Sequence, residues 1–121
     1  MIRIDFLGTG NAFTPSGRLH ALTLIDGKIL IDTPPTLITQ LRRKGLKTSE
    51  IEYLLFTHWH ADHTFGFPFF MLERKYISDP KRENDLKIYL RPGGKEKISN
   101  LCNIGFPGSL EDVEKMAHWY E

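Results

Sequence analysis

Apolar and polar residues follow one another along the first part of the chain in a pattern typical of strands. Residues 2–6 alternate between apolar and polar and run into a glycine, which predicts a first strand that ends at a turn. The apolar runs 21–25 and 28–31 lie on either side of Asp26-Gly27, and Asp-Gly between two apolar runs is a strong sequence signal for a β-hairpin. We therefore expect strands in all three segments.

The rest of the chain predicts helices and strands in alternation. Leu37, Ile38 and Leu41 show helical spacing, and Gly45 follows a basic last turn, so a helix is expected over 36–44. The continuous apolar run 53–56 is typical of a strand that is buried on both faces. Further along, the pattern predicts a helix over 67–76 with Phe69, Phe70, Leu72 and Tyr76 facing largely inward, a strand over 86–90, a helix over 94–103 and a last helix over 110–119.

Composition and charge are those of an ordinary globular protein. The 121 residues suffice for one domain with a modest core, and 40% of them are hydrophobic and 26% charged. The net charge of +1 gives no electrostatic reason to expect nucleic acid or a membrane surface as a partner. Cys102 is the one cysteine and cannot form an internal disulfide, and the sequence shows neither a signal peptide nor a membrane-spanning run. We expect a cytoplasmic protein with a single domain over residues 1–121.

The strongest chemical signal is a run of metal-ligand residues directly after the apolar segment 53–56, and it reads Thr57-His58-Trp59-His60-Ala61-Asp62-His63. A strand end places residues i and i+2 on the same side, so His58 and His60 can converge on one metal ion. The chain then turns into a helix, which puts Asp62 and His63 where they can hold a second ion. The spacing therefore predicts two metal ions held by one short segment.

The kinds of ligand indicate the chemistry. Imidazole and carboxylate suit zinc, with manganese and iron as alternatives. Two such ions about 3.5–4 Å apart can bridge a hydroxide and clamp an ester or a phosphodiester. A surface or core cluster of histidines would explain the segment without a metal, but clustered imidazoles repel one another when protonated. We therefore favour a binuclear hydrolase site.

The pattern His58-x-His60-x-Asp62-His63 after an apolar strand resembles the signature of the metallo-β-lactamase superfamily. Segments 6–10, 30–32, 66–68 and 88–94 resemble its ribonuclease Z and phosphodiesterase branch, so the resemblance covers most of residues 2–95. It implies a four-layer αββα fold with the metals at the edge of the sheet. This chain would be an α/β structure that forms the N-terminal half of that fold, with a mixed sheet and flanking helices.

The resemblance also implies residue roles. His58 and His60 would bind the first zinc ion and Asp62 and His63 the second, with Asp62 also the candidate catalytic residue. Asp32 would hydrogen-bond to the metal loop and orient it, although an aspartate in a turn at the end of a strand is an equal alternative. The implied activity is metal-dependent hydrolysis of a phosphodiester or another ester by a metal-bound hydroxide.

Two departures from the family pattern narrow this expectation. Asp32 is followed by Thr33-Pro34-Pro35 and not by the glycine–glutamate–glycine stretch of tRNA-processing members, so RNA is not favoured over a small-molecule ester or phosphodiester. Family members also carry further ligands in a second half. Of the remaining histidines, His118 is expected on a helix surface and His20 in a solvated loop, so neither supplies a missing ligand.

The chain is therefore expected to be a truncated domain that lacks its C-terminal half. It would be completed by that half, or it would form a homo-oligomer because the apolar strands lack a covering layer. Helices 36–44 and 110–119 covering both faces of the sheet are the alternative. The alternative function is an inactive half-domain that binds metal or a partner without turnover.

Overall fold

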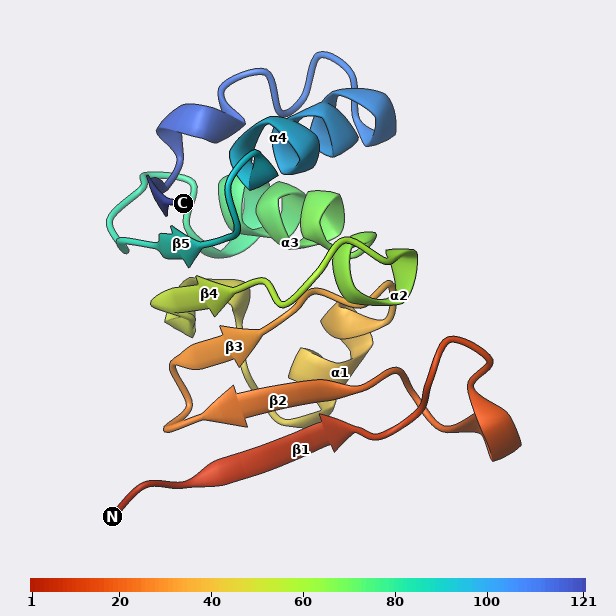
Figure 1. Cartoon of the computed structure of the whole chain (residues 1–121). Helices are drawn as coiled ribbons and strands as arrows, with labels where there is room; N and C mark the ends of the chain where they lie inside the picture. The colour runs from red at the N-terminus through yellow and green to blue at the C-terminus, as the bar shows by residue number, and fades with distance from the viewer.

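The computed structural model describes residues 1–121, and its strands form one six-stranded sheet in the order β1-β2-β3-β4-β5-β6 (Figure 1). The strands are β1 (Ile4–Gly8), β2 (Leu22–Ile25), β3 (Ile29–Ile31), β4 (Tyr53–Leu55), β5 (Lys87–Tyr89) and β6 (His118–Tyr120). The helices are α1 (Leu37–Arg43), α2 (Ala61–Thr64), α3 (Phe67–Glu73), which continues into a π-helical turn (Arg74–Ser78), and α4 (Gly94–Gly105). None of the helices is long and apolar enough to cross a membrane.

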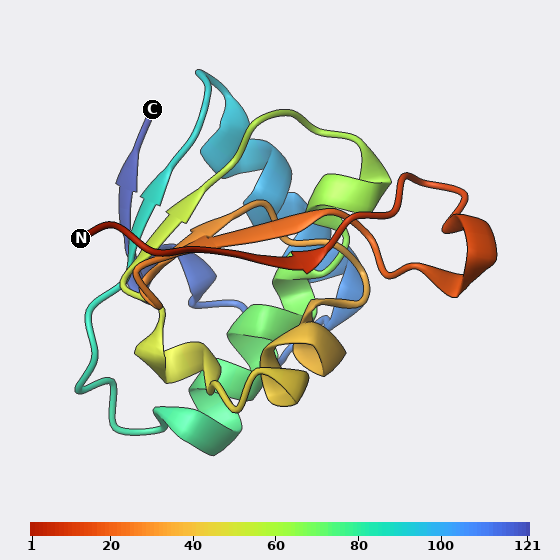
Figure 2. The ribbon, with the colours of Figure 1, turned by 90° about the horizontal axis from the view of Figure 1, so that it is seen from below.

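The sheet is mixed, and its connections determine where the helices lie. β1, β2 and β3 are antiparallel neighbours, whereas the pairs β3–β4, β4–β5 and β5–β6 are parallel. Each parallel pair needs a crossover, and three right-handed crossovers that advance in the same direction put their helices on the same side of a sheet. Figure 2 shows α1, α3 and α4 together on one side of the strands.

The core lies between the sheet and these helices. The strands contribute alternate side chains to it, as expected when one face of a sheet is covered. Buried strand residues of the core are Leu22, Leu24, Leu30, Leu54 and Ile88, and the helices contribute Leu37, Leu41, Phe67, Phe70, Met71, Ile98 and Cys102. The expected α/β class with a mixed sheet and flanking helices is confirmed, but helices flank one face only. The alternative in which helices cover both faces is therefore wrong.

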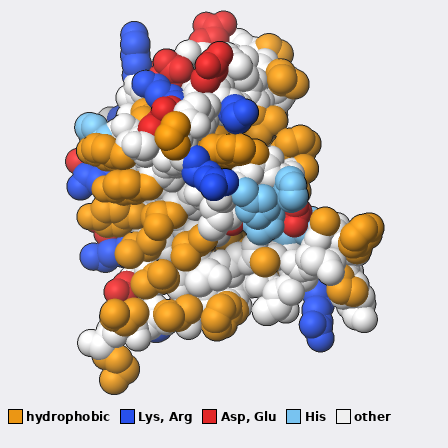
Figure 3. Space-filling model, in the orientation of Figure 1, with side chains coloured by type: hydrophobic (Ala, Val, Ile, Leu, Met, Phe, Trp, Pro, Cys, Tyr) orange, Lys and Arg blue, Asp and Glu red, His pale blue; other side chains and the backbone are white.

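The other face of the sheet carries mostly apolar side chains and has no covering layer. The residues that alternate with the buried ones on paired strands point outward, and they include Ile4, Phe6, Ile25, Ile29, Ile31, Tyr53, Leu55, Tyr89 and Tyr120. Phe6 is 71% exposed, and Ile4, Tyr89 and Tyr120 are exposed as well. Figure 3 shows apolar side chains gathered over the strands. We call these nine residues the open sheet face.

The expected helix over 110–119 is wrong. A short 3-10 turn, Val113–Lys115, precedes β6, which pairs in parallel with β5. The His118 N–H donates to the Leu86 carbonyl at 2.9 Å, and the Trp119 ring lies 6.0 Å from that of Phe67. Pairing with a distant strand and packing of the partly buried indole against the core thus override the local helical pattern.

The helix expected over 67–76 is confirmed as α3 and its π-helical extension, but the predicted inner face is partly wrong. Phe69 and Tyr76 are 49% and 52% exposed. The buried positions are Phe67, Pro68, Phe70, Met71 and Arg74. These positions repeat every three or four residues, which is the spacing that places side chains on one helical face. Phe70 belongs to both sets, whereas Phe69 and Tyr76 lie on the exposed side of the helix.

Candidate metal centre

The metal-ligand segment lies where two parallel strands end side by side. β3 ends at Ile31 and β4 at Leu55, and the two are paired in register. Asp32 directly follows β3, and its N–H donates to the Leu55 carbonyl at 2.7 Å. Residues 57–60 lead from β4 into α2, which begins at Ala61. The carboxyl ends of neighbouring parallel strands are where open α/β sheets bind ligands.

The three imidazoles of the segment lie close together. The ring centroid of His58 is 4.7 Å from that of His60 and 4.0 Å from that of His63. Asp62 reaches the same group, because its Oδ2 lies 3.2 Å from Nε2 of His63. The structure thus brings all four predicted ligand residues to one place after β4. His60 is exposed, whereas His58, Asp62 and His63 are partly buried.

Asp32 forms hydrogen bonds to residues of this cluster. Its side chain is only 6% exposed, and its backbone has a positive φ of 69°. Such a conformation costs free energy for a residue other than glycine and persists only where surrounding contacts hold it. Three donors hold the carboxylate: Thr57 N at 2.8 Å, Thr57 Oγ1 at 2.6 Å and His63 Nδ1 at 2.8 Å. The Asp32 carboxylate is therefore an acceptor that ties the Thr57 backbone and hydroxyl and the His63 ring to the end of β3.

The bond between Asp32 and His63 fixes the protonation pattern of that ring. A carboxylate can only accept, so Nδ1 of His63 carries the proton that it donates to Asp32. Nε2 of a neutral His63 then has a lone pair, and it faces Oδ2 of Asp62 at 3.2 Å. Two acceptors at this distance need a cation between them. A proton or a metal ion can fill that role, and ligand atoms around a tetrahedral zinc with bonds of about 2.0–2.1 Å are roughly 3.3 Å apart.

The ligand atoms that converge most tightly come from Asp32, His58 and His63, and all lie within 4.8 Å of one another. This set differs from the predicted one, which has His60 and Asp62 in place of Asp32. We regard Asp32 as a support and not as a ligand, because three hydrogen bonds already occupy its two oxygens. The candidate ligand atoms of the other residues remain available at the surface.

Thr33 and Gly66 join the metal loop to the turn after β3, a role that the sequence did not predict for either residue. The Thr33 N–H donates to the His63 carbonyl at 2.7 Å, and its hydroxyl donates to the Thr64 carbonyl at 3.2 Å. A Cβ at Gly66 would overlap the Pro34 carbonyl oxygen, so only glycine permits this close approach. The Thr33-Pro34 departure from the family pattern therefore has a structural role.

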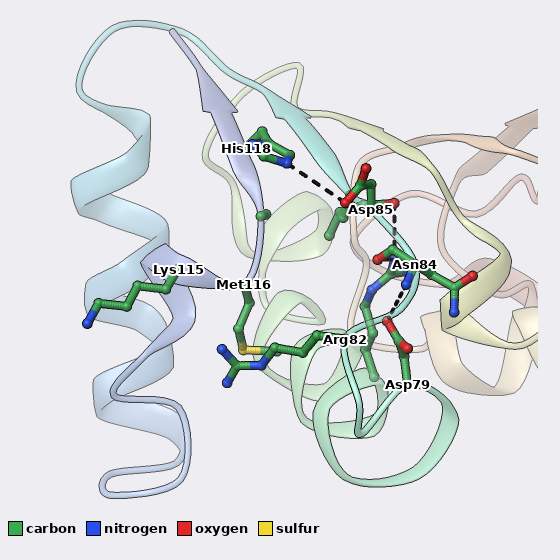
Figure 4. Close-up of a pocket in the computed structure, with 10 residues that line it drawn as sticks. Asp79, Arg82, Asn84, Asp85, Lys115, Met116 and His118 are labelled. Atoms are coloured by element: carbon green, nitrogen blue, oxygen red, sulfur yellow. Dashed lines mark hydrogen bonds and ion pairs between the residues drawn. The ribbon is translucent and has the colours of Figure 1, made fainter.

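Neither of the other two histidines joins the cluster. His20 lies in the first loop, where its Nδ1 is 3.4 Å from the Thr36 hydroxyl and its carbonyl accepts a hydrogen bond from Gln40. His118 was expected on a helix surface and instead begins β6, at the amino-terminal ends of the parallel strands, whereas the metal loop lies at their carboxyl ends. Its side chain is 60% exposed and lines a small cavity beside Asp85, 3.9 Å away (Figure 4).

The fold is that of the N-terminal half of metallo-β-lactamase fold proteins such as YhfI from Bacillus subtilis, which superposes with a TM-score of 0.64 over 82% of this chain and 42% of that one, at 14% identity. A crystal structure of the short form of human tRNase Z superposes with a TM-score of 0.72 over 98% of this chain and 44% of that one, at 24% identity. Zn(2+)-bound PqqB from Methylobacterium extorquens gives a TM-score of 0.61 over 98% of this chain and 48% of that one, at 15% identity. The chain belongs to the family described as Anti-Pycsar protein Apyc1, whose model matches residues 2–115.

The chain is also similar in sequence to ribonuclease Z proteins. Ribonuclease Z of Pyrococcus abyssi is 32% identical over 116 residues, which are 93% of this chain and 37% of that protein. Ribonuclease Z of Nanoarchaeum equitans is 30% identical over 118 residues, which are 91% of this chain and 36% of that protein. The chain thus spans little more than a third of the length of these relatives. The predicted resemblance to the ribonuclease Z branch is confirmed, as is the N-terminal half of the fold.

Proposed function

We propose that this chain is the metal-binding half of a metal-dependent hydrolase that cleaves a phosphodiester. The observation that carries the proposal is the pair of facing acceptors, His63 Nε2 and Asp62 Oδ2, 3.2 Å apart beside the rings of His58 and His60. Such an arrangement needs a cation, and three imidazoles with one carboxylate are a donor set that divalent metals prefer. Zinc is the first choice, with manganese and iron as alternatives.

Each residue has a role in this proposal. His58 and His60 hold one ion, and Asp62 and His63 hold a second. A bound divalent metal would lower the pKa of water and polarise the oxygen of the scissile ester. Only one oxygen of Asp62 contacts His63, so its other oxygen can take a proton from the attacking water. Asp32 orients His63 through their 2.8 Å hydrogen bond.

The substrate class is inferred from the relatives and from the residues. Ribonuclease Z relatives indicate a phosphodiester, and RNA is the form that their name describes. The net charge of +1 provides no strong unassisted attraction for a polyanion. A phosphodiester is therefore the proposed bond, and RNA and small phosphodiesters are the two substrates to compare.

Metal content tests the proposal. The purified chain, incubated with zinc and desalted, should retain metal, and His60→Ala and His63→Ala should retain less. His118→Ala is the matched control, because that histidine lies at the amino-terminal ends of the parallel strands, away from the metal loop at their carboxyl ends, and it should behave as the wild type. Equal retention by all four proteins, or none by the wild type, would refute the metal-binding role.

A half-domain without turnover is the second candidate function. It is favoured by the chain spanning 37% of a ribonuclease Z, while the cluster provides only two ligands for each ion. The isolated chain should then hydrolyse bis(p-nitrophenyl) phosphate and RNA poorly or not at all. Metal-dependent turnover that His60→Ala abolishes would show instead that the chain, alone or as an oligomer, forms a complete site.

A further inference from the structure

The side chain of Thr57 connects Asp32 to His58. The sequence does not predict this connection. Its N–H donates to Oδ1 of Asp32 at 2.8 Å, and its hydroxyl lies 2.6 Å from Oδ2 of the same carboxylate. The hydroxyl oxygen also lies 2.9 Å from Nδ1 of His58. One side chain thus contacts both the buried carboxylate and the first imidazole of the cluster.

The number of protons fixes the direction of each bond. A carboxylate accepts, so the single proton of the Thr57 hydroxyl is donated to Asp32. The hydroxyl oxygen can then only accept from His58, so Nδ1 of His58 carries a proton. This leaves the lone pair of a neutral His58 on Nε2. The ring of His58 lies 4.0 Å from that of His63, whose Nδ1 is likewise protonated toward Asp32.

We propose that Thr57 is a positioning residue that holds His58 in the Nδ1–H tautomer with Nε2 available to a metal. Asp32 then orients two ligands, His63 by a direct bond and His58 through the Thr57 hydroxyl. This inference rests on the proposed metal-binding function of the cluster. Partners that fix the tautomer and orientation of metal-binding histidines strongly affect metal affinity.

The physical effect of losing the hydroxyl follows from the contacts. The Thr57 hydroxyl makes the one hydrogen bond to Nδ1 of His58, so without it the ring should exchange between tautomers and orientations. Only the fraction with an unprotonated Nε2 facing the cluster can bind metal, and the apparent affinity falls by that fraction. Thr57→Val removes the hydroxyl but keeps the side-chain shape and the backbone N–H bond to Asp32. Thr57→Ser keeps the hydroxyl and is the matched control.

The first measurement needs no metal. Nitrogen-15 chemical shifts of His58 in the metal-free chain, at a pH where its imidazole is neutral, report which ring nitrogen carries the proton. The wild type and Thr57→Ser should show a protonated Nδ1, and Thr57→Val should show a mixture of tautomers. A Thr57→Val chain with the wild-type shifts would overturn the proposal.

The second measurement is zinc affinity, by competition with a chelating dye. Thr57→Val should bind roughly tenfold more weakly than the wild type, and Thr57→Ser should stay close to it. Equal losses in both variants would overturn the proposal, because the hydroxyl would not then be the group that matters. A wild-type chain that binds no zinc would contradict the proposed function instead, and the tautomer comparison would still decide the role of Thr57.

Discussion

At the scale of single residues, the candidate site depends on one buried carboxylate that three hydrogen bonds hold in place. Asp32 adopts a φ of 69° and accepts from Thr57 and His63. A hydrogen bond to a charged acceptor contributes about 1.5–3 kcal/mol, which exceeds the contribution of a neutral pair. The position and the charge of this residue therefore both matter to the metal loop.

Asp32→Asn should weaken zinc binding by about 10–100-fold. Both oxygens of Asp32 accept hydrogen bonds, and in the variant an NH₂ group, which can only donate, replaces one of them. Asn tolerates the left-handed backbone, so stability should change less than in Asp32→Ala. Zinc titration and urea denaturation of both variants measure the two effects. Asp26→Asn is the control, since Asp26 also has a positive φ, of 53°, but lies in the hairpin turn. Equal zinc affinity of the Asp32→Asn and Asp26→Asn chains would contradict the role of Asp32.

The sequence predicted the residues of this site that are close together along the chain, and it missed those whose partners are distant. The four ligand candidates lie within six residues, so strand and helix geometry alone brings them together. Asp32 came from the family resemblance. Thr57 and Thr33 act on partners 25 to 31 residues away, so only the pairing of β3 with β4 reveals their contacts.

At the scale of elements, local sequence patterns predicted strands and turns correctly, whereas strand pairing between distant segments was not predicted. The Asp26-Gly27 turn joins β2 to β3 as expected, because both strands are adjacent in the sequence. The last helix was wrong because residues 118–120 pair with β5, about thirty residues upstream. The inner face of α3 was misplaced because several neighbouring aromatic residues offered more than one apolar stripe.

The start of α4 packs directly on the metal loop. A Cβ at Gly94 would overlap the ring of Trp59, which lies between His58 and His60. Gly94→Ala should displace that ring, destabilise the chain by about 1–3 kcal/mol and weaken zinc binding. Gly105→Ala, at the other end of α4, is the control, because its Cβ would lie at an ordinary 3.5 Å from Pro68. Urea denaturation compares the two, and equal stability would refute this packing argument.

At the scale of the whole molecule, the open sheet face is the main unusual feature. The helices α1, α3 and α4 lie on one side of the sheet, while Ile4, Phe6, Tyr89 and Tyr120 are exposed on the other. Contiguous apolar patches beyond a few hundred Å² are uncommon on monomers. Since the chain covers 44% of the human tRNase Z structure, we propose that a further layer covers this face in the complete fold.

The isolated chain should therefore self-associate or bind a hydrophobic dye. Light scattering and fluorescence of an anilinonaphthalene sulfonate dye measure these properties directly. Replacing Phe6 and Tyr89 by serine should reduce both, whereas replacing the exposed Ile77 on the helical side by serine should not. A monodisperse monomer that binds no dye would contradict the proposal that the open sheet face is an uncovered interface.

We propose that the His58–His63 segment binds a divalent metal through imidazole and carboxylate ligands. X-ray absorption spectroscopy of the zinc-loaded chain tests it most directly. We predict nitrogen or oxygen scatterers at about 2.0–2.1 Å, with the outer-shell pattern of imidazole, and loss of that pattern in a His58→Ala/His63→Ala chain. A sulfur scatterer at about 2.3 Å would point to Cys102, and that result, or an imidazole pattern unchanged in the double variant, would contradict the account.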